Sequence, residues 1–200
     1  MPNLNLNQTA LLLMGYQNDY FAEDGILHNV VDEPAQYSRV LNNTVTLIQH
    51  WSNSPATIIA TPVTFTSTYA ELPDPVGILK TIKEDQAFRA GSWGVQMVQE
   101  LIPFYEKNQI VELEGRQSFN AFANTKLDAI LEEKSVQSLV LAGAATAVCI
   151  DSTARAAHER GYQVNILSDC IISRTDLEQE LYVDSIFPLY AETLTSLDLC

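Results

Sequence analysis

Five short apolar runs, each followed by polar or turn-forming residues, constrain the fold of this 200-residue chain most strongly. Continuous apolar runs of this length are typical of strands buried on both faces. Helical patterns, with apolar residues three and four positions apart, separate them and indicate repeated strand–helix–strand units. We therefore predict a single α/β domain over residues 1–200, a three-layer α/β/α architecture with a mostly parallel, Rossmann-like sheet. The expected strands are 9–14, 56–60, 109–113, 138–142 and 163–167, and the expected helices are 37–51, 93–101, 125–133 and 150–160.

The long stretch between the second expected strand and Trp93 has weak periodicity and contains Pro73, Pro75 and Gly77. A functional lid, an oligomer contact and a plain irregular surface are all open interpretations of such a segment. Ligands of parallel sheets bind beyond the carboxyl ends of the strands, near the point where the strand order reverses. The segments that follow four of the expected strands should therefore meet at one edge, namely 15–21, 61–68, 114–122 and 143–149.

The charge and composition narrow the classes of partner and compartment. The chain has 25 acidic and 11 basic residues, so its formal net charge of −14 disfavours nucleic acid and anionic membranes as partners. No apolar run approaches the ~20 residues that span a bilayer, and the N-terminal residues lack the pattern of a signal peptide. The three cysteines show no disulfide or CxxC spacing, which predicts a cytoplasmic protein. The three histidines (His28, His50, His158) share no metal-ligand spacing, so we expect neither a metal nor another cofactor.

Cys149 has the most informative surroundings of the three cysteines. The expected strand 138–142 ends before Gly143, small residues follow, and a helical pattern then continues to Gly161. A thiol in the first turn of a helix lies near unpaired backbone N–H groups and the positive end of the helix dipole. That setting favours the thiolate, which is the nucleophilic form. Cys170 and Cys200 have no comparable context, and we interpret both as structural or incidental.

Four motifs, in order along almost the whole chain, resemble the isochorismatase-like cysteine hydrolases. Residues 11–21 are similar to the family's apolar run followed by Asp-x-Gln-Asn-Asp-Phe, and 91–94 are similar to its Gly-Thr/Ser-x-Gly segment. Residues 116–127 resemble its Lys-x-x-x-Ser-Ala-Phe-x-x-Thr-x-Leu. Residues 143–150 resemble its Gly-Val-x-Thr-x-x-Cys-Val. The resemblance implies the family's fold and hydrolysis of a small carbonyl substrate.

Carried over position by position, the family's catalytic Asp, Lys and Cys fall on Gly15, Arg116 and Cys149. The resemblance implies that the cysteine attacks the carbonyl while the Asp moves protons and the Lys stabilises charge. Glycine has no side chain for proton transfer, which contributes roughly 10²–10⁴-fold to rate. Arginine keeps the positive charge but does not lose a proton near neutral pH. We therefore expect Cys149 as nucleophile and Arg116 as its electrostatic partner, in a degenerate triad.

Several alternatives stay open at this point. Asp19 or Glu114 could replace the missing base, or the substrate could be a thioester or activated ester whose leaving group needs less help. A catalytically impaired protein that binds a small molecule without turnover is the main alternative function. Redox sensing by an exposed thiolate is a third.

The resemblance also implies further site residues and an assembly. The Ala144–Ala145 bond is the expected place of the family's non-proline cis peptide, which, with the backbone at Cys149, would direct an N–H group at an oxyanion. The nicotinamidase branch of the family carries an Asp-x-His and a nearby His after its second strand, whereas residues 61–66 (Thr-Pro-Val-Thr-Phe-Thr) contain neither, which disfavours a metal site and nicotinamidase activity. A homo-oligomer is expected. The candidate pocket residues are Asp19, Phe21, Phe65, Trp93, Glu114 and Phe122.

Overall fold

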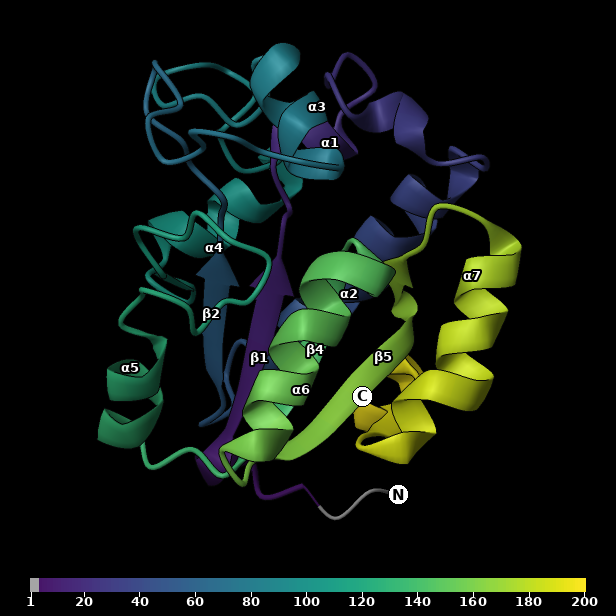
Figure 1. Ribbon diagram of the computed structural model, residues 1–200. Coiled ribbons are helices and arrows are strands. Elements are labelled where there is room, and N and C mark those ends of the chain that lie inside the picture. Colours follow the sequence, from purple (N-terminus) through teal and green to yellow (C-terminus); the bar gives the residue numbers. More distant parts are fainter. Residues whose placement is uncertain (1–3) are drawn as a thin grey trace.

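A computed structural model of the protein describes residues 4–200 and contains one six-stranded, wholly parallel sheet with helices on both faces (Figure 1). The strand order is β3-β2-β1-β4-β5-β6. This confirms the predicted three-layer α/β/α architecture. The strands are β1 (Thr9–Met14), β2 (Thr57–Thr61), β3 (Val111–Glu112), β4 (Ser138–Ala144), β5 (Gln163–Ile172) and β6 (Glu192–Leu194).

Strand β1 lies at the centre of the sheet, and its side chains alternate between two separate apolar cores. Leu11 and Leu13 contact the core on the side of helix α2, whereas Leu12 and Met14 contact the core on the side of α5 and α6. Every residue of β1 is buried because both faces are covered. In Figure 1, α6 lies in front of the sheet and α2 lies behind it.

Within residues 4–200, seven α-helices lie between and around the strands. They are α1 (Asn18–Phe21), α2 (Ala35–Trp51), α3 (Ile78–Glu84), α4 (Ile102–Glu106), α5 (Leu127–Glu133), α6 (Asp151–Glu159) and α7 (Asp176–Leu181). A π-helical turn over Thr146–Ile150 leads into α6. No helix within residues 4–200 is both long and apolar enough to cross a membrane.

All five predicted strands are present, although β3 is shorter than expected and β5 continues to Ile172. The short strand β6 and the helices α1, α3 and α7 were not predicted. The helix predicted over 93–101 is wrong over its first part, because only Gln99–Leu101 is helical, as a 3-10 turn leading into α4. The backbone there pairs with the segment after β1: the N–H groups of Asn18 and Asp19 donate to the carbonyl oxygens of Gln96 and Gly94, both at 2.9 Å.

The strand order reverses between β1 and β4, since the chain runs outward through β2 and β3 on one side and through β5 and β6 on the other. A crevice at the carboxyl ends of these two central strands is the usual ligand site of such sheets. Gly15 follows β1 and the turn that carries Cys149 follows β4, so this edge is where the candidate residues converge.

Candidate active site

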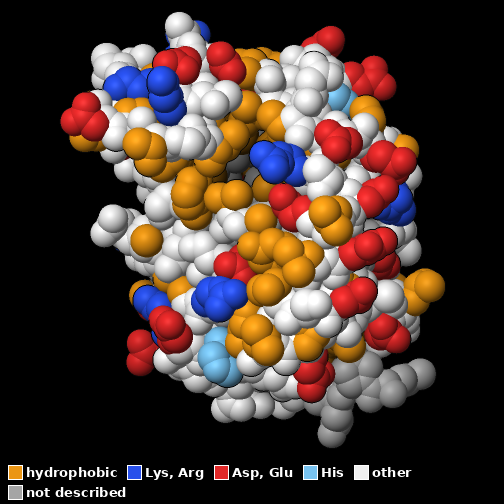
Figure 2. All heavy atoms as spheres, turned by 45° about the vertical axis from the view of Figure 1, so that its right-hand side comes forward, with side chains coloured by type: hydrophobic (Ala, Val, Ile, Leu, Met, Phe, Trp, Pro, Cys, Tyr) orange, Lys and Arg blue, Asp and Glu red, His pale blue; other side chains and the backbone are white. Residues whose placement is uncertain are grey.

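A cavity lies at the carboxyl edge of the sheet, with an empty volume of about 590 Å³ that includes the space at its mouth. Figure 2 shows this part of the molecule hollowed, with hydrophobic side chains around the hollow. The cavity brings together Cys149, Arg116 and Gly15, the three positions carried over from the family triad. The other lining residues are Tyr20, Leu27, Val63, Phe65, Ile78, Leu79, Ile82, Phe88, Ser118, Phe119, Ala144, Ala145 and Val148.

Cys149 lies in the π-helical turn between β4 and α6 and is partly buried. Small residues allow this abrupt change from strand to helix: Gly143 has φ = 120°, and a side chain there would collide with the carbonyl oxygen of Met14 on the neighbouring strand. The turn therefore holds the Cys149 thiol at the start of a helix and at the wall of the cavity. This is the placement that the sequence predicts for a nucleophilic cysteine.

Gly15 directly follows β1 and has a positive φ of 69°, a conformation that favours glycine. A Cβ atom at this position would lie 3.0 Å from the carbonyl oxygen of Ala144. The backbone therefore approaches the turn before Cys149 closely. Where the family's carboxylate is expected, this chain has neither the side chain nor ample room for one.

Arg116 is completely buried, although its side chain is charged. Its Nη1 donates to the backbone oxygen and the hydroxyl of Thr61 at 2.6 and 3.3 Å, its Nε to the oxygen of Ser118 at 3.1 Å, and its Nη2 to the oxygen of Phe119 at 2.9 Å. The planar guanidinium thus ties the end of β2 to the loop after β3. No salt bridge or hydrogen bond joins it to an acidic residue or to the Cys149 thiol within residues 4–200. Its positive charge is therefore held in the cavity wall without a protein counter-ion.

The backbone around the Ala144–Ala145 bond leaves the Ala145 N–H without an acceptor among the described residues. The bond is cis, as the sequence resemblance implies. The N–H of Cys149 donates to the carbonyl oxygen of Ala145 at 3.0 Å, so it is already engaged. The N–H of Ala145 donates to no backbone or side-chain acceptor among the described residues. An oxyanion in this cavity could therefore accept from the Ala145 N–H without displacing an existing bond.

Asp19 does not line the cavity, contrary to its prediction as a pocket residue and substitute base. Its carboxylate accepts from the Phe88 N–H at 2.6 Å and packs so closely on Gly94 that a Cβ there would overlap it. The neighbouring Gln17 side chain bonds the backbone of Val63 in both directions at 2.8 Å and that of Val95 at 2.8 Å. The Gln-Asn-Asp part of the first motif therefore holds the loops around the cavity together through hydrogen bonds.

Glu114 is exposed, and it lies in a separate depression beside Glu112 and Gly115. If the alternation of a strand continued through both residues, Glu114 would lie on the same face as Arg116. Strand β3 ends at Glu112, and Gly115 turns the chain with φ = 83°, so this alternation stops. The structure does not bring Glu114 to the thiol.

Of the four aromatic residues predicted to line the pocket, only Phe65 lines the cavity. Phe21 stacks on the ring of Tyr16 with 4.6 Å between ring centroids. Trp93 is 52% exposed on the surface. Phe122 belongs to the core on the α5 and α6 side, where the guanidinium of Arg160 lies 4.4 Å from its ring centroid.

The sequence analysis did not identify two contributions to the cavity wall, one from helix α3 and one from Tyr20. Helix α3 supplies Ile78, Leu79 and Ile82 from the long segment after β2, so part of that segment covers the cavity and is not plain irregular surface. Tyr20 supplies a phenol from α1. The signals were present but weak: one short apolar cluster at Ile78, Leu79 and Ile82, and a tyrosine at the position where the family motif has phenylalanine.

Comparison with known proteins agrees with this fold. A model of the Isochorismatase domain matches residues 9–198. The chain belongs to the isochorismatase family. Among similar proteins, the uncharacterized isochorismatase family protein YddQ of Bacillus subtilis is 28% identical over 86% of this chain and 83% of its own length. The ureidoacrylate amidohydrolase RutB of Cronobacter sakazakii is 29% identical over 74% of this chain and 67% of its own length.

A solved structure with the same fold is a cysteine hydrolase from Pseudomonas syringae pv. phaseolicola 1448A. It superposes with a TM-score of 0.84 at 19% identity and covers 98% of this chain and 92% of its own. The protein is therefore assigned, through its family, to the class of small-molecule hydrolases. Within residues 4–200, no cluster of three or more His, Cys, Asp or Glu side chains is placed to hold a metal ion.

Proposed function

We propose that this isochorismatase-family protein hydrolyses a small carbonyl compound through a thioester on Cys149. One observation carries the proposal: the Cys149 thiol lies at a helix start in the wall of an apolar cavity, together with the buried Arg116. An apolar cavity with a few polar groups at one end is typical of a site that orients one reactive bond of a small ligand.

In the proposed reaction, the Cys149 thiolate attacks the carbonyl carbon and the carbonyl electrons move to oxygen. The Ala145 N–H can donate to this oxyanion, and the unpaired charge of Arg116 stabilises negative charge in the same low-dielectric space. Collapse of the tetrahedral intermediate expels the leaving group and leaves a thioester. Attack of water then releases the acid and regenerates the thiol.

The cavity supports a restricted choice of leaving group. None of its described lining residues carries a carboxylate, and Gly15 stands where the family has its Asp. A departing amine must take up a proton, whereas a thiolate or an activated alkoxide can leave without one. We therefore propose thioesters or activated esters as the substrate class, with amides slower by roughly 10²–10⁴-fold, the usual contribution of a positioned acid–base group.

Binding without turnover is the second candidate function. It is favoured by the same missing carboxylate and by the engagement of Arg116 with three backbone oxygens, which resembles a structural tie more than a mobile catalytic group. In this alternative the cavity still takes a small carbonyl compound. A homo-oligomer and a cytoplasmic location stay predictions of the sequence.

Steady-state hydrolysis of p-nitrophenyl acetate and of p-nitroacetanilide tests the proposal. We expect multiple turnovers of the ester and little hydrolysis of the anilide. Cys149→Ala should abolish ester turnover, and Cys170→Ala should preserve it because Cys170 is absent from the cavity wall. Ester turnover that survives Cys149→Ala would refute the thioester mechanism. Saturable binding with no turnover beyond one equivalent would establish the second candidate.

A further inference from the structure

The hydroxyl of Tyr20 is a buried polar group for which the protein provides no hydrogen-bond partner. The residue is 8% exposed, and its hydroxyl oxygen is buried without a donor or acceptor among residues 4–200. Burying a hydroxyl without a partner costs roughly 1–3 kcal/mol in proteins, so such a group in a native structure requires an explanation. Tyr20 lines the same cavity as Cys149.

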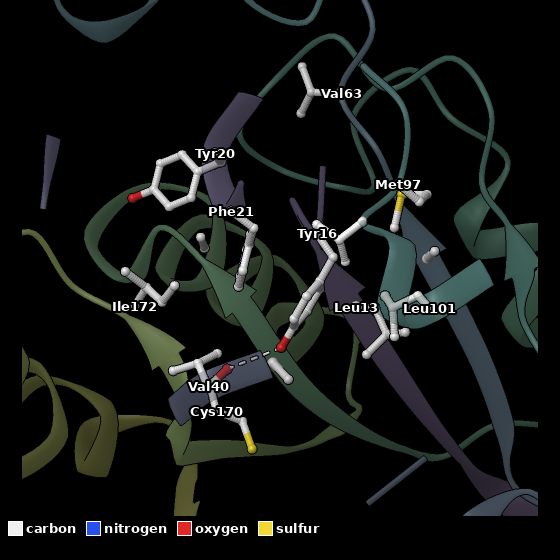
Figure 3. Packing of buried hydrophobic residues seen from close by; sticks show 14 of the residues in the cluster. Leu13, Tyr16, Tyr20, Phe21, Val40, Val63, Met97, Leu101, Cys170 and Ile172 are labelled. Atoms are coloured by element: carbon white, nitrogen blue, oxygen red, sulfur yellow. Dashed lines mark hydrogen bonds between the residues drawn. The ribbon is translucent and has the colours of Figure 1, made fainter. Parts of the chain in front are cut away.

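The ring of Tyr20 is fixed by its aromatic neighbours while its hydroxyl is left free. It packs against Phe21 and Tyr37 with ring centroids 6.0 and 5.7 Å apart. Figure 3 shows the ring at the edge of the apolar cluster, with the hydroxyl directed away from Tyr16 and Phe21. A rigid ring with an unpaired hydroxyl is well suited to recognise one polar atom of a ligand.

The protonation state of the Tyr20 hydroxyl decides whether it can recognise a donor or an acceptor atom of a ligand. Burial raises the pKa of the Tyr20 hydroxyl well above its ordinary value, and the neighbouring Tyr37, Cys149 and Glu178 raise it further. The phenol therefore stays protonated at neutral pH. It cannot replace the missing Asp as a base, but it can donate a hydrogen bond to an acceptor.

We infer that the Tyr20 hydroxyl is a specificity-determining group that donates a hydrogen bond to a second acceptor on the substrate, apart from the carbonyl that Cys149 attacks. This inference rests on the proposed function and names the substrate class more closely. The substrate has an apolar body, a carbonyl at the thiol and a further oxygen or nitrogen acceptor facing Tyr20. A ligand without that acceptor would leave the phenol buried and unpaired, which is how polar sites reject apolar analogues.

Matched aldehydes test this inference, since an aldehyde takes the thiol of Cys149 as a hemithioacetal: the C–S bond forms and the thiol proton moves to the aldehyde oxygen. Dissociation constants are measured by calorimetry for acetyl-benzaldehydes and the isosteric isopropyl-benzaldehydes, each substituted at the 3 or the 4 position. The wild type should prefer an acetyl compound over its isopropyl partner. Tyr20→Phe should reduce that preference about tenfold, the usual effect of losing one hydrogen bond to a buried group.

Tyr105→Phe is the control, because Tyr105 on α4 also has a buried hydroxyl but does not line the cavity. It should leave the preference unchanged. The melting temperature of ligand-free Tyr20→Phe should be equal to or above that of the wild type, since no hydrogen bond within the protein is lost.

The outcomes separate this inference from the proposed function. An unchanged acetyl preference in Tyr20→Phe, with aldehyde binding that still requires Cys149, would overturn the inference and leave the thiol chemistry standing. A lower melting temperature with an unchanged preference would likewise overturn it and assign Tyr20 a structural role. Aldehyde binding that is equal in the wild type and in Cys149→Ala would overturn the proposed function and, with it, the inference.

Discussion

Cys149 and Cys170 both lie towards the carboxyl side of the sheet, on or just after the neighbouring strands β4 and β5, yet their surroundings differ completely. Cys149 stands at a helix start in a cavity wall, whereas Cys170 is fully buried in the core beside Tyr16 (Figure 3). Burial, and then the charge of Asp169, raises the pKa of the Cys170 thiol to about 12. The comparison teaches that position along a parallel sheet does not make a thiol reactive. A thiol also needs an opening, and it must be free of apolar burial.

Thiol labelling gives the largest expected difference between the two cysteines. At pH 7.5 a pKa of about 12 leaves so little thiolate that iodoacetamide should modify Cys170 at least about a thousandfold more slowly than a free cysteine. Cys149 should be modified much faster, because it lines an open cavity. Mass spectrometry of tryptic peptides after timed labelling measures each rate separately.

A Cys200→Ser background removes the exposed third thiol from this experiment. Equal labelling rates at Cys149 and Cys170 would contradict the difference in accessibility between the two thiols, since the core around β5 would then have to open as readily as the cavity. A fully denatured sample, in which the two rates should converge, controls for the labelling chemistry itself.

Restoring the carboxylate at position 15 sharpens the account of Cys149. Gly15→Asp should raise hydrolysis of p-nitroacetanilide by about 10²-fold, the lower end of what a positioned acid–base group contributes. The gain is limited because φ is 69° and the new Cβ would lie 3.0 Å from the oxygen of Ala144. Such strain costs about 1 kcal/mol, although Asp tolerates this conformation better than most residues.

Gly15→Asn is the matched control, since it has nearly the same shape and backbone tolerance but no charge to move a proton. Hydrolysis that rises equally in both variants would show that a changed loop, not the carboxylate, is responsible.

Adding Arg116→Lys should lower stability, because a lysine cannot reproduce the bonds from one planar group to Thr61, Ser118 and Phe119.

The strands, the parallel sheet and the triad positions were predictable because each depends on a local pattern. Runs such as residues 11–14 are apolar throughout, and the small residues before Cys149 predict a turn between strand and helix. The motif fixed the order of Gly15, Arg116 and Cys149 along the chain, and the switch point between β1 and β4 brings them together.

The walls of the cavity were not predictable from such local patterns. Asp19 accepts from the backbone of Phe88, which is 69 residues away in the sequence, and no spacing rule reports that contact. The helix expected at Trp93 does not form because the chain after β1 pairs with that backbone. Tertiary hydrogen bonds thus outweigh a weak helical periodicity in this loop. The backbone of Phe65, which lines the cavity, is likewise hydrogen-bonded to that of Phe88 and Ala90.

The smallest expected effect concerns the pH dependence of stability at Cys170. Its thiol stays protonated in the folded protein up to a pKa of about 12, whereas the unfolded chain releases that proton near pH 9. Between those values the unfolded state binds fewer protons, so the free energy of unfolding falls as the pH rises. From pH 8 to pH 10 the loss from this group should be about 1.4 kcal/mol. Urea unfolding of the wild type and of Cys170→Ala at both pH values isolates it, because the buried tyrosines and Cys149 are common to both proteins. If the two proteins lose the same stability over this range, Cys170 is not held as a neutral thiol, and the contrast with Cys149 rests on exposure alone.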